Sequence, residues 1–285
     1  MTFLKRLTDL FVFGNIYVAI PVTCLAWESY LLVDQSPSPL LLAFVYAATL
    51  LLYSVHRFVG VTAMRVGVAS ARHEWAQRNK VVLAGIIGLS TGASLILFVQ
   101  LGSPITVPLL AAAAMAGLYA LPIIPGKAGF QRLRDLPGIK IYFIVAAVTL
   151  VTLHWPLSGV SLSATDWVLF TLERALFLLA ITIPFDVRDL QADAGAKLNT
   201  IPLRIGESQS VRLSLLLIGL FAALVGLHYA LSPEVDSAEL LALEFSALIT
   251  GVILLQVKST RSEYFFSLLV EGTMVVQFAL VWLMR

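Results

Sequence analysis

The chain has 285 residues, of which 59% are hydrophobic and only 13% are charged. An ordinary soluble domain has roughly 45–50% apolar and about 25% charged residues, so this composition excludes a soluble fold. The formal net charge of +2 is small, and the placement of Lys and Arg along such a chain is more informative than their sum. The single cysteine, Cys24, excludes an internal disulfide and a CxxC metal site. We expect the protein to lie in the lipid bilayer and to have no nucleic-acid partner.

Long apolar runs, separated by polar or Pro- and Gly-containing breaks, predict nine transmembrane helices. The predicted spans are approximately 10–33, 39–60, 81–101, 104–122, 138–156, 166–186, 210–231, 238–257 and 264–284. They leave no room for a sizeable extramembrane domain. We therefore predict an all-α integral membrane protein, a nine-transmembrane-helix bundle in which residues 1–285 form a single polytopic domain.

The cations are distributed unequally between the two sides of this predicted bundle. Of the 19 Lys and Arg residues, all except Arg174 and Arg285 fall at the N-terminus or at the loops after spans 2, 4, 6 and 8. The loops after spans 1, 3, 5 and 7 contain none. Because cytoplasmic loops carry the excess of Lys and Arg, we place the N-terminus in the cytoplasm and the C-terminus outside.

A run of carboxylates follows the sixth span. Asp186, Asp189 and Asp193 are spaced so that, on one continuous helix, all three lie on one face within about 60° of arc. Hard oxygen ligands that leave coordination positions open suit Mg2+, which is usually held by one or two carboxylates together with substrate phosphates. Arg188 and Lys197 are placed to donate to the same anion. The alternative is a solvated acidic helix end.

This stretch carries a resemblance to a known family. Residues 186–206 read D-x-x-D-x-x-x-D-x-G-x-K-x-x-T-x-P-x-x-x-G, which resembles the second aspartate-rich motif and following loop of the UbiA superfamily of intramembrane prenyltransferases. The resemblance implies a helical bundle with a central cavity open to the cytoplasmic side. It also implies that Mg2+, held by Asp186, Asp189 and Asp193, binds the diphosphate of a prenyl diphosphate.

The chain departs from the family at the end of the second span, where a first aspartate-rich motif is expected. Residues 53–65 contain no carboxylate, and Tyr53, His56, Arg57 and Arg65 stand there instead. In one interpretation, His56 and Arg57 bind the diphosphate directly and replace a metal ion. In the other, the site no longer ionises a diphosphate. A simple interfacial belt of aromatic and cationic side chains is the third possibility.

Other polar residues are less specific. Lys140 stands one step inside the fifth span and is a candidate for the bundle interior, whereas Arg132 and Arg134 fit an ordinary basic loop. Asn15 is a candidate for the acceptor pocket or for an interhelical hydrogen bond. Glu271 lies within the ninth span, where related sequences have an Asp. Arg174 and Glu173 lie within the sixth span, and we expect Glu28 or Glu244 to pair with Arg174. We assign no role to His154 and His228.

These residues support an enzyme that transfers a prenyl group to a hydrophobic acceptor, with an aromatic ring as the expected acceptor. Asp186, Asp189 and Arg57 would be the catalytic groups, and His56, Arg57, Arg188, Lys197, Tyr53, Lys140 and Asn15 would bind substrate. Electrostatic stabilisation of the leaving diphosphate is the main catalytic effect that such a site offers. Two alternatives remain open: a lipid or quinone binder or carrier that has lost half of the metal site, and a prenyl diphosphate cyclase.

Overall fold

The computed structural model describes residues 3–63, 70–102, 106–120, 124–126, 129–131, 138–195, 198–232 and 237–285. The chain is almost entirely helical, as predicted. The first half contains α1 (Phe3–Phe13), α2 (Ile16–Leu31), α3 (Pro39–Ala63), α4 (Ala71–Arg78), α5 (Lys80–Gln100) and α6 (Val107–Ala120). A short antiparallel hairpin, which the all-α prediction did not include, follows as β1 (Ile124–Gly126) and β2 (Gly129–Gln131).

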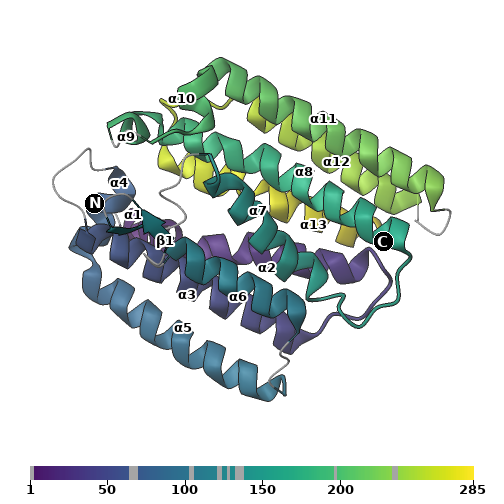
Figure 1. Ribbon diagram of the computed structural model, residues 1–285, viewed down its shortest axis with the longest axis horizontal. Coiled ribbons are helices and arrows are strands. Elements are labelled where there is room, and N and C mark those ends of the chain that lie inside the picture. The colour runs from purple at the N-terminus through teal and green to yellow at the C-terminus, as the bar shows by residue number, and fades with distance from the viewer. Residues whose placement is uncertain are drawn as a thin grey trace.

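In the described part of the second half, all the elements are helices. They are α7 (Lys140–Thr149), the π-helix η2 (Leu150–His154), α8 (Ala164–Arg188), α9 (Leu190–Gly195), α10 (Ile201–Ile205), α11 (Glu207–Leu231), α12 (Ser237–Leu254), the π-helix η3 (Phe265–Val270) and α13 (Thr273–Met284). The chain ends lie at opposite ends of the bundle, and α4, α9 and α10 share the end that holds the N-terminus (Figure 1). We call this end the α4 end.

Each predicted span coincides with a helical segment, but only some segments are long enough to be assigned as crossings. Within the described ranges, six helices are long and apolar enough to cross a membrane, or seven if the bent pair α1–α2 forms one span. Two shorter apolar helices cover Val107–Leu118 and Lys140–His154. The protein is therefore a multi-pass membrane protein, and the total of nine crossings stays a prediction.

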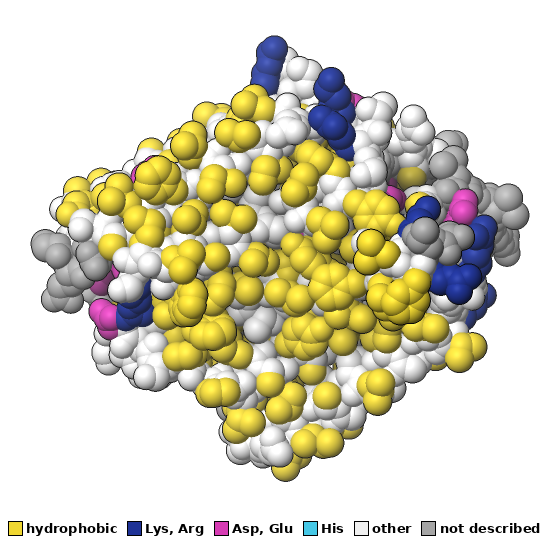
Figure 2. All heavy atoms as spheres, turned by 180° about the vertical axis from the view of Figure 1, so that it is seen from behind, with side chains coloured by type: hydrophobic (Ala, Val, Ile, Leu, Met, Phe, Trp, Pro, Cys, Tyr) yellow, Lys and Arg dark blue, Asp and Glu magenta, His cyan; other side chains and the backbone are white. Residues whose placement is uncertain are grey.

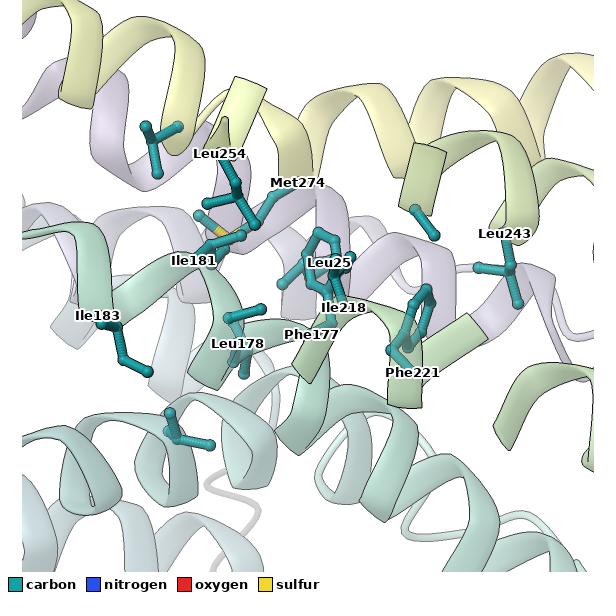
Figure 3. Packing of buried hydrophobic residues seen from close by; sticks show 14 of the residues in the cluster. Leu25, Phe177, Leu178, Ile181, Ile183, Ile218, Phe221, Leu243, Leu254 and Met274 are labelled. Atoms are coloured by element: carbon teal, nitrogen blue, oxygen red, sulfur yellow. The ribbon is translucent and has the colours of Figure 1, made fainter. Parts of the chain in front are cut away.

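The bundle packs around α8. This helix contacts α7 and α11, and α2 contacts both α3 and α13. Phe177 of α8 packs against Phe221 of α11 with ring centroids 5.5 Å apart and the rings tilted by 53°, and Leu25 of α2 and Ile218 of α11 lie beside them (Figure 3). Burial of such large apolar side chains removes well over 100 Å² each from solvent, so this cluster fixes the position of α8 relative to its neighbours.

The first predicted span is not a straight helix. Between α1 and α2 the chain bends by 51°, and Asn15 adopts a left-handed backbone conformation with φ of 63°. Its side chain is buried, and Nδ2 donates a 3.3 Å hydrogen bond to Ser54 Oγ of α3. Asn tolerates the left-handed region better than most residues, which explains why it stands at this break.

The outer face of the bundle is apolar. Exposed Leu, Val, Ile and Phe side chains cover one broad side, and the charged side chains lie at its margins (Figure 2). On α5, for example, Val81, Leu89 and Val99 are all largely exposed. Contiguous apolar surface of this extent is what a lipid-facing surface presents.

Candidate functional site at the α4 end of the bundle

Three arginines from three different helices converge at the α4 end. Arg72 of α4 donates from Nη2 to Asp189 Oδ1 at 2.8 Å. Arg188 grips the same carboxylate with two donors, Nε to Oδ1 and Nη2 to Oδ2, both at 2.9 Å. Arg57 of α3 lies within electrostatic range of Arg72 and Arg188. We call Arg57, Arg72 and Arg188 the arginine cluster.

Local packing holds α4 where Arg72 can reach the cluster. Ala76 of α4 and Leu83 of α5 are fully buried and pack with Val61 and Phe58 of α3 and with Trp75. Ser70, just before the helix, lies 2.7 Å from His73 through Oγ and Nδ1. An eight-residue helix is marginal alone, so these contacts, together with the Arg72–Asp189 ion pair, are what hold it in place.

Arg188 is held on several sides. Its guanidinium lies 4.9 Å from the ring centroid of Phe185 and 5.8 Å from that of Phe266, distances at which an arginine interacts with an aromatic ring face. Glu263 approaches Arg188 Nη1 at 3.6 Å and Arg72 Nε at 3.9 Å. The Arg188 side chain is only 11% exposed. It is therefore a preorganised cation at a largely dry position.

Arg57 retains unused donor capacity. Its Nη1 is buried and has no hydrogen-bond partner among the described residues. Glu263 and Glu271 are the carboxylates within electrostatic range of Arg57. A buried guanidinium nitrogen without an acceptor is costly, so this nitrogen is available to an anion that enters the cluster.

A second group of charges lies next to the cluster. Lys140, the first residue of α7, places Nζ 2.9 Å from Asp186 Oδ1 of α8. Asp193 of α9 is buried, within electrostatic range of Lys140, Asp186 and Asp189. Asp193 Oδ2 has no hydrogen-bond donor in the described part of the chain. The expectation that Lys140 points toward the bundle interior is supported by its contact with the buried Asp186.

The expectation that three aspartates share the face of one continuous helix is wrong. The helix α8 ends at Arg188, Asp189 is its C-cap with φ of −86° and ψ of 5°, and α9 begins at Leu190. Asp189 forms ion pairs with Arg72 and Arg188, whereas Asp186 forms an ion pair with Lys140. Spacing could not reveal which cation each carboxylate faces, because Arg72 and Lys140 come from α4 and α7, which are distant in the sequence.

Asp189 and Asp193, which both follow α8, have pKa values shifted in opposite directions. Burial alone would raise the pKa of Asp189, but the guanidinium groups of Arg188 and Arg72 outweigh burial and hold that pKa well below its usual range. For Asp193, burial and the neighbouring Asp189 and Asp186 raise the pKa to about 6, although Lys140 opposes the shift. Asp189 is therefore a fixed anion, and Asp193 lacks sufficient compensating positive charge.

These residues fit one divalent cation better than two. Across the described residues there is no group of three His, Cys, Asp or Glu side chains that could hold a metal ion by themselves. Both oxygens of Asp189 already accept from arginines. This leaves the carboxylates of Asp186 and Asp193, whose Oδ2 has no partner among the described residues, and a set of two carboxylates suits one Mg2+ whose remaining ligands are phosphate and water.

Four residues that the sequence analysis names lie outside the described residues: Lys197, Arg65, Arg132 and Arg134. Tyr53 and His56 are half-buried on α3, one turn before and immediately before Arg57. Asn15 makes the interhelical hydrogen bond described above. Sequence reasoning did not select Arg72 or Glu263, because nothing in their local sequence distinguishes them from ordinary loop charges.

A second polar network lies in the other half of the bundle. Arg174 Nη2 donates to Glu28 Oε1 at 3.0 Å, and the two side chains are 4% and 1% exposed. This confirms Glu28 as the partner of Arg174, in preference to Glu244. His228, to which we assigned no role from the sequence, lies 2.8 Å from Glu173 through Nδ1 and Oε1.

Comparisons with known proteins identify the fold. No protein-family model matches the chain, and no curated protein matches it in sequence. A UbiA homologue from Archaeoglobus fulgidus bound to GPP and Mg2+ matches with a TM-score of 0.64 and 14% identity, over 97% of this chain and 98% of that one. A UbiA homologue from that organism bound to DMAPP and Mg2+ gives 0.60 and 15%, over 96% and 98%.

A third solved structure, of a digeranylgeranylglyceryl phosphate synthase, matches with a TM-score of 0.53 and 15% identity, over 98% of this chain and 96% of that one. The similarity therefore extends over nearly the whole chain in each case. At these identities it establishes the fold alone. The chain has the fold of the UbiA homologues, as the resemblance implied, and the motif match in residues 186–206 stays a prediction.

Proposed function

We propose that this protein is a UbiA-type prenyltransferase, which transfers a prenyl group from a prenyl diphosphate to a hydrophobic acceptor within the membrane. An aromatic ring is the acceptor that we expect. The observation that carries the proposal is the arginine cluster: three guanidinium groups from α3, α4 and α8 meet at one end of the bundle, and Arg57 Nη1 lacks an acceptor in the described part of the chain.

Charge and geometry suit this cluster to a diphosphate. Guanidinium groups donate to phosphate oxygens in a planar fork, and such charge-assisted hydrogen bonds are stronger than neutral ones. Asp189 fixes Arg72 and Arg188 in position before substrate arrives. As the C–O bond of the prenyl diphosphate breaks, negative charge develops on the leaving diphosphate, and donors that are already in place stabilise it without reorganisation.

Asp186 and Asp193 are the residues that would hold Mg2+, together with substrate phosphate. When bound, the ion would supply additional positive charge to the leaving group. Asp189 would act by orienting Arg72 and Arg188 rather than as a metal ligand. Lys140, His56, Tyr53, Lys197 and Asn15 complete the proposed substrate contacts, and the ring face of Tyr53 would shelter the allylic cation. In this proposal the α4 end faces the cytoplasm, with the N-terminus inside and the C-terminus outside.

A second candidate function is binding of an anionic lipid or a quinone without turnover. The observation that favours it is the engagement of Asp189 with two arginines, since this leaves fewer carboxylate oxygens for metal ions than a site with two aspartate-rich motifs would have. A prenyl diphosphate cyclase would use the same ionisation step and would form product without an acceptor.

One experiment separates these functions. Purified protein in lipid nanodiscs is incubated with radiolabelled geranyl diphosphate and Mg2+, with and without a panel of phenols and quinols, and both inorganic diphosphate and prenylated product are measured. A prenyltransferase releases diphosphate in step with acceptor-dependent product, and a cyclase forms product without an acceptor. Saturable binding without either product would contradict the enzymatic proposal and favour a binding protein.

A further inference from the structure

A row of ionisable side chains crosses the half of the bundle away from the α4 end. Asp166 lies in the first turn of α8, and Glu173 and Arg174 lie two turns further along the same helix. His228 of α11 stands between Asp166 and Glu173, and Glu28 of α2 pairs with Arg174. Only Asp166 reaches solvent appreciably, with its side chain 23% exposed. The prenyl-transfer proposal assigns no role to these residues.

The two ring nitrogens of His228 both face carboxylates. Nδ1 lies 2.8 Å from Glu173 Oε1, and Nε2 lies 3.3 Å from Asp166 Oδ1. A neutral imidazole has one N–H and one acceptor nitrogen, so it can donate to only one of the two oxygens. The other nitrogen would then direct its lone pair at an ionised oxygen. The arrangement is satisfied when one additional proton is present, either on the imidazole or on Glu173.

The charge balance of the buried groups leads to the same conclusion. Glu28, Glu173 and Arg174 are 1%, 5% and 4% exposed, so two carboxylates share one permanent cation away from water. Uncompensated charge at membrane depth is strongly unfavourable. One further proton makes the set of Glu28, Glu173, Arg174 and His228 neutral.

Arg174 reaches only one oxygen of Glu28, Oε1, among the described residues. Within the described ranges, neither Glu28 Oε2 nor Gln277 Oε1 of α13 has a hydrogen-bond donor. Both residues line a cavity of about 10 Å³ together with Glu173 and Arg174. A cavity of this size is at the lower limit for one water molecule, which would donate to both oxygens but would add no charge. A proton is a positive charge that needs no further space in this part of the bundle.

We propose that His228, Glu173 and Asp166 form a buried binding site for one proton, which is shared between the imidazole and the carboxylates and is held at neutral pH. Among the described residues, the charged groups coupled to this site are Arg174 of α8, which neighbours Glu173, and Glu28 of α2. The cavity lining from α12 is Leu243, and that from α13 is the uncharged Gln277. The site is independent of prenyl transfer, so its test needs no substrate.

The test is a measurement of protonation on the wild-type protein. Protein labelled with 15N-histidine is reconstituted in lipid nanodiscs at neutral pH, and solid-state NMR distinguishes imidazolium from neutral imidazole for each of the 4 histidines. Infrared spectroscopy of the same sample detects a protonated carboxyl group. We expect either an imidazolium signal that His228→Gln removes or a carboxylic acid band that Glu173→Gln removes.

A matched control and a charge-neutralising variant sharpen the test. His154→Gln alters another half-buried histidine, which stacks on Trp167 and contacts Thr171, and we expect it to leave both signatures unchanged. Glu173→Gln removes one buried negative charge, so we expect the bound proton to be lost. A neutral His228 together with no acid band that is sensitive to Glu173→Gln, in wild-type protein at neutral pH, would overturn the proposal.

Discussion

Arg72 Nη2 lies 2.8 Å from Asp189 Oδ1, although the two residues are 117 positions apart in the chain. This ion pair joins α4 to the end of α8. Because Arg188 binds the same carboxylate, Asp189 holds two guanidinium groups next to each other that would otherwise repel. The pair therefore builds the arginine cluster as well as fastening α4.

The first prediction concerns the role of Arg72 in binding. Arg72→Gln removes one charged donor from the cluster, and a hydrogen bond to a charged group contributes roughly 1.5–3 kcal/mol. We therefore expect the affinity for geranyl diphosphate to fall about 10- to 100-fold in equilibrium binding. Arg78→Gln is the matched control on the same helix, since its side chain is 78% exposed and pairs with Glu74 of the same helix. Equal losses in the two variants would argue against a specific role of Arg72.

The second prediction concerns Mg2+. If Asp186 and Asp193 hold the ion, Asp186→Ala and Asp193→Ala each lower Mg2+-dependent transfer by about 100-fold or more, because the leaving diphosphate loses its additional positive charge. Turnover is measured in nanodiscs across a Mg2+ titration. The exposed Glu74→Ala serves as the control. Full activity in both aspartate variants would remove the metal assignment.

The third prediction separates Asp189 from these two residues. Asp189→Asn keeps the shape of the side chain but removes the charge that holds Arg72 and Arg188 together. We expect weaker binding of geranyl diphosphate even without Mg2+, by about 10-fold or more. The measurement is binding in the presence of a chelator. A defect that appears only when Mg2+ is present would instead make Asp189 a metal ligand.

The fourth prediction concerns the buried pair of Arg174 and Glu28. Removal of one partner from a buried ion pair leaves the other charge uncompensated and costs about 3–5 kcal/mol. We expect Arg174→Met to lower the free energy of unfolding by this amount, measured by denaturant titration in mixed micelles. The double variant Arg174→Met with Glu28→Leu should recover much of the loss, since apolar replacement of a whole buried pair is often tolerated. A double variant as unstable as Arg174→Met would contradict this explanation.

The fifth prediction concerns the break between α1 and α2. Ala in the left-handed conformation of residue 15 costs about 1–2 kcal/mol, whereas Gly adopts it freely. Both substitutions remove the hydrogen bond to Ser54. We therefore expect Asn15→Ala to be less stable than Asn15→Gly by about that difference in the same unfolding assay. If the two variants are equally stable, the backbone at residue 15 is not strained.

Hydropathy was sufficient to predict most of the fold, because each apolar run must form its own backbone hydrogen bonds in lipid. The break at Asn15 was not predicted, since the apolar run continues through it without Pro. The helix α4 was also missed: it is short and polar, and its position depends on packing of Trp75 and Ala76 against neighbouring helices. Such tertiary contacts leave little trace in local periodicity.

The sequence predicted some residues of the candidate site, but it predicted neither Arg72 nor the arrangement of the charges. Asp186, Asp189, Arg57 and Arg188 do lie at one end of the bundle, because all four stand where spans end. Which charge pairs with which could not be derived, since Arg72 reaches Asp189 from α4 and Lys140 reaches Asp186 from α7. Glu28 was one of two partners expected for Arg174, because a cation in a span requires a buried carboxylate and few were available; the structure selects it over Glu244.

The most direct measurement is equilibrium binding of radiolabelled geranyl diphosphate to the purified wild-type protein in nanodiscs. If the arginine cluster is a prenyl diphosphate site, binding of geranyl diphosphate is saturable and inorganic diphosphate competes with it. The double variant Arg57→Gln with Arg188→Gln then shows no binding, whereas Arg78→Gln binds as the wild-type protein does. Absence of saturable binding by wild-type protein, or undiminished binding by the Arg57 and Arg188 double variant, would contradict the account.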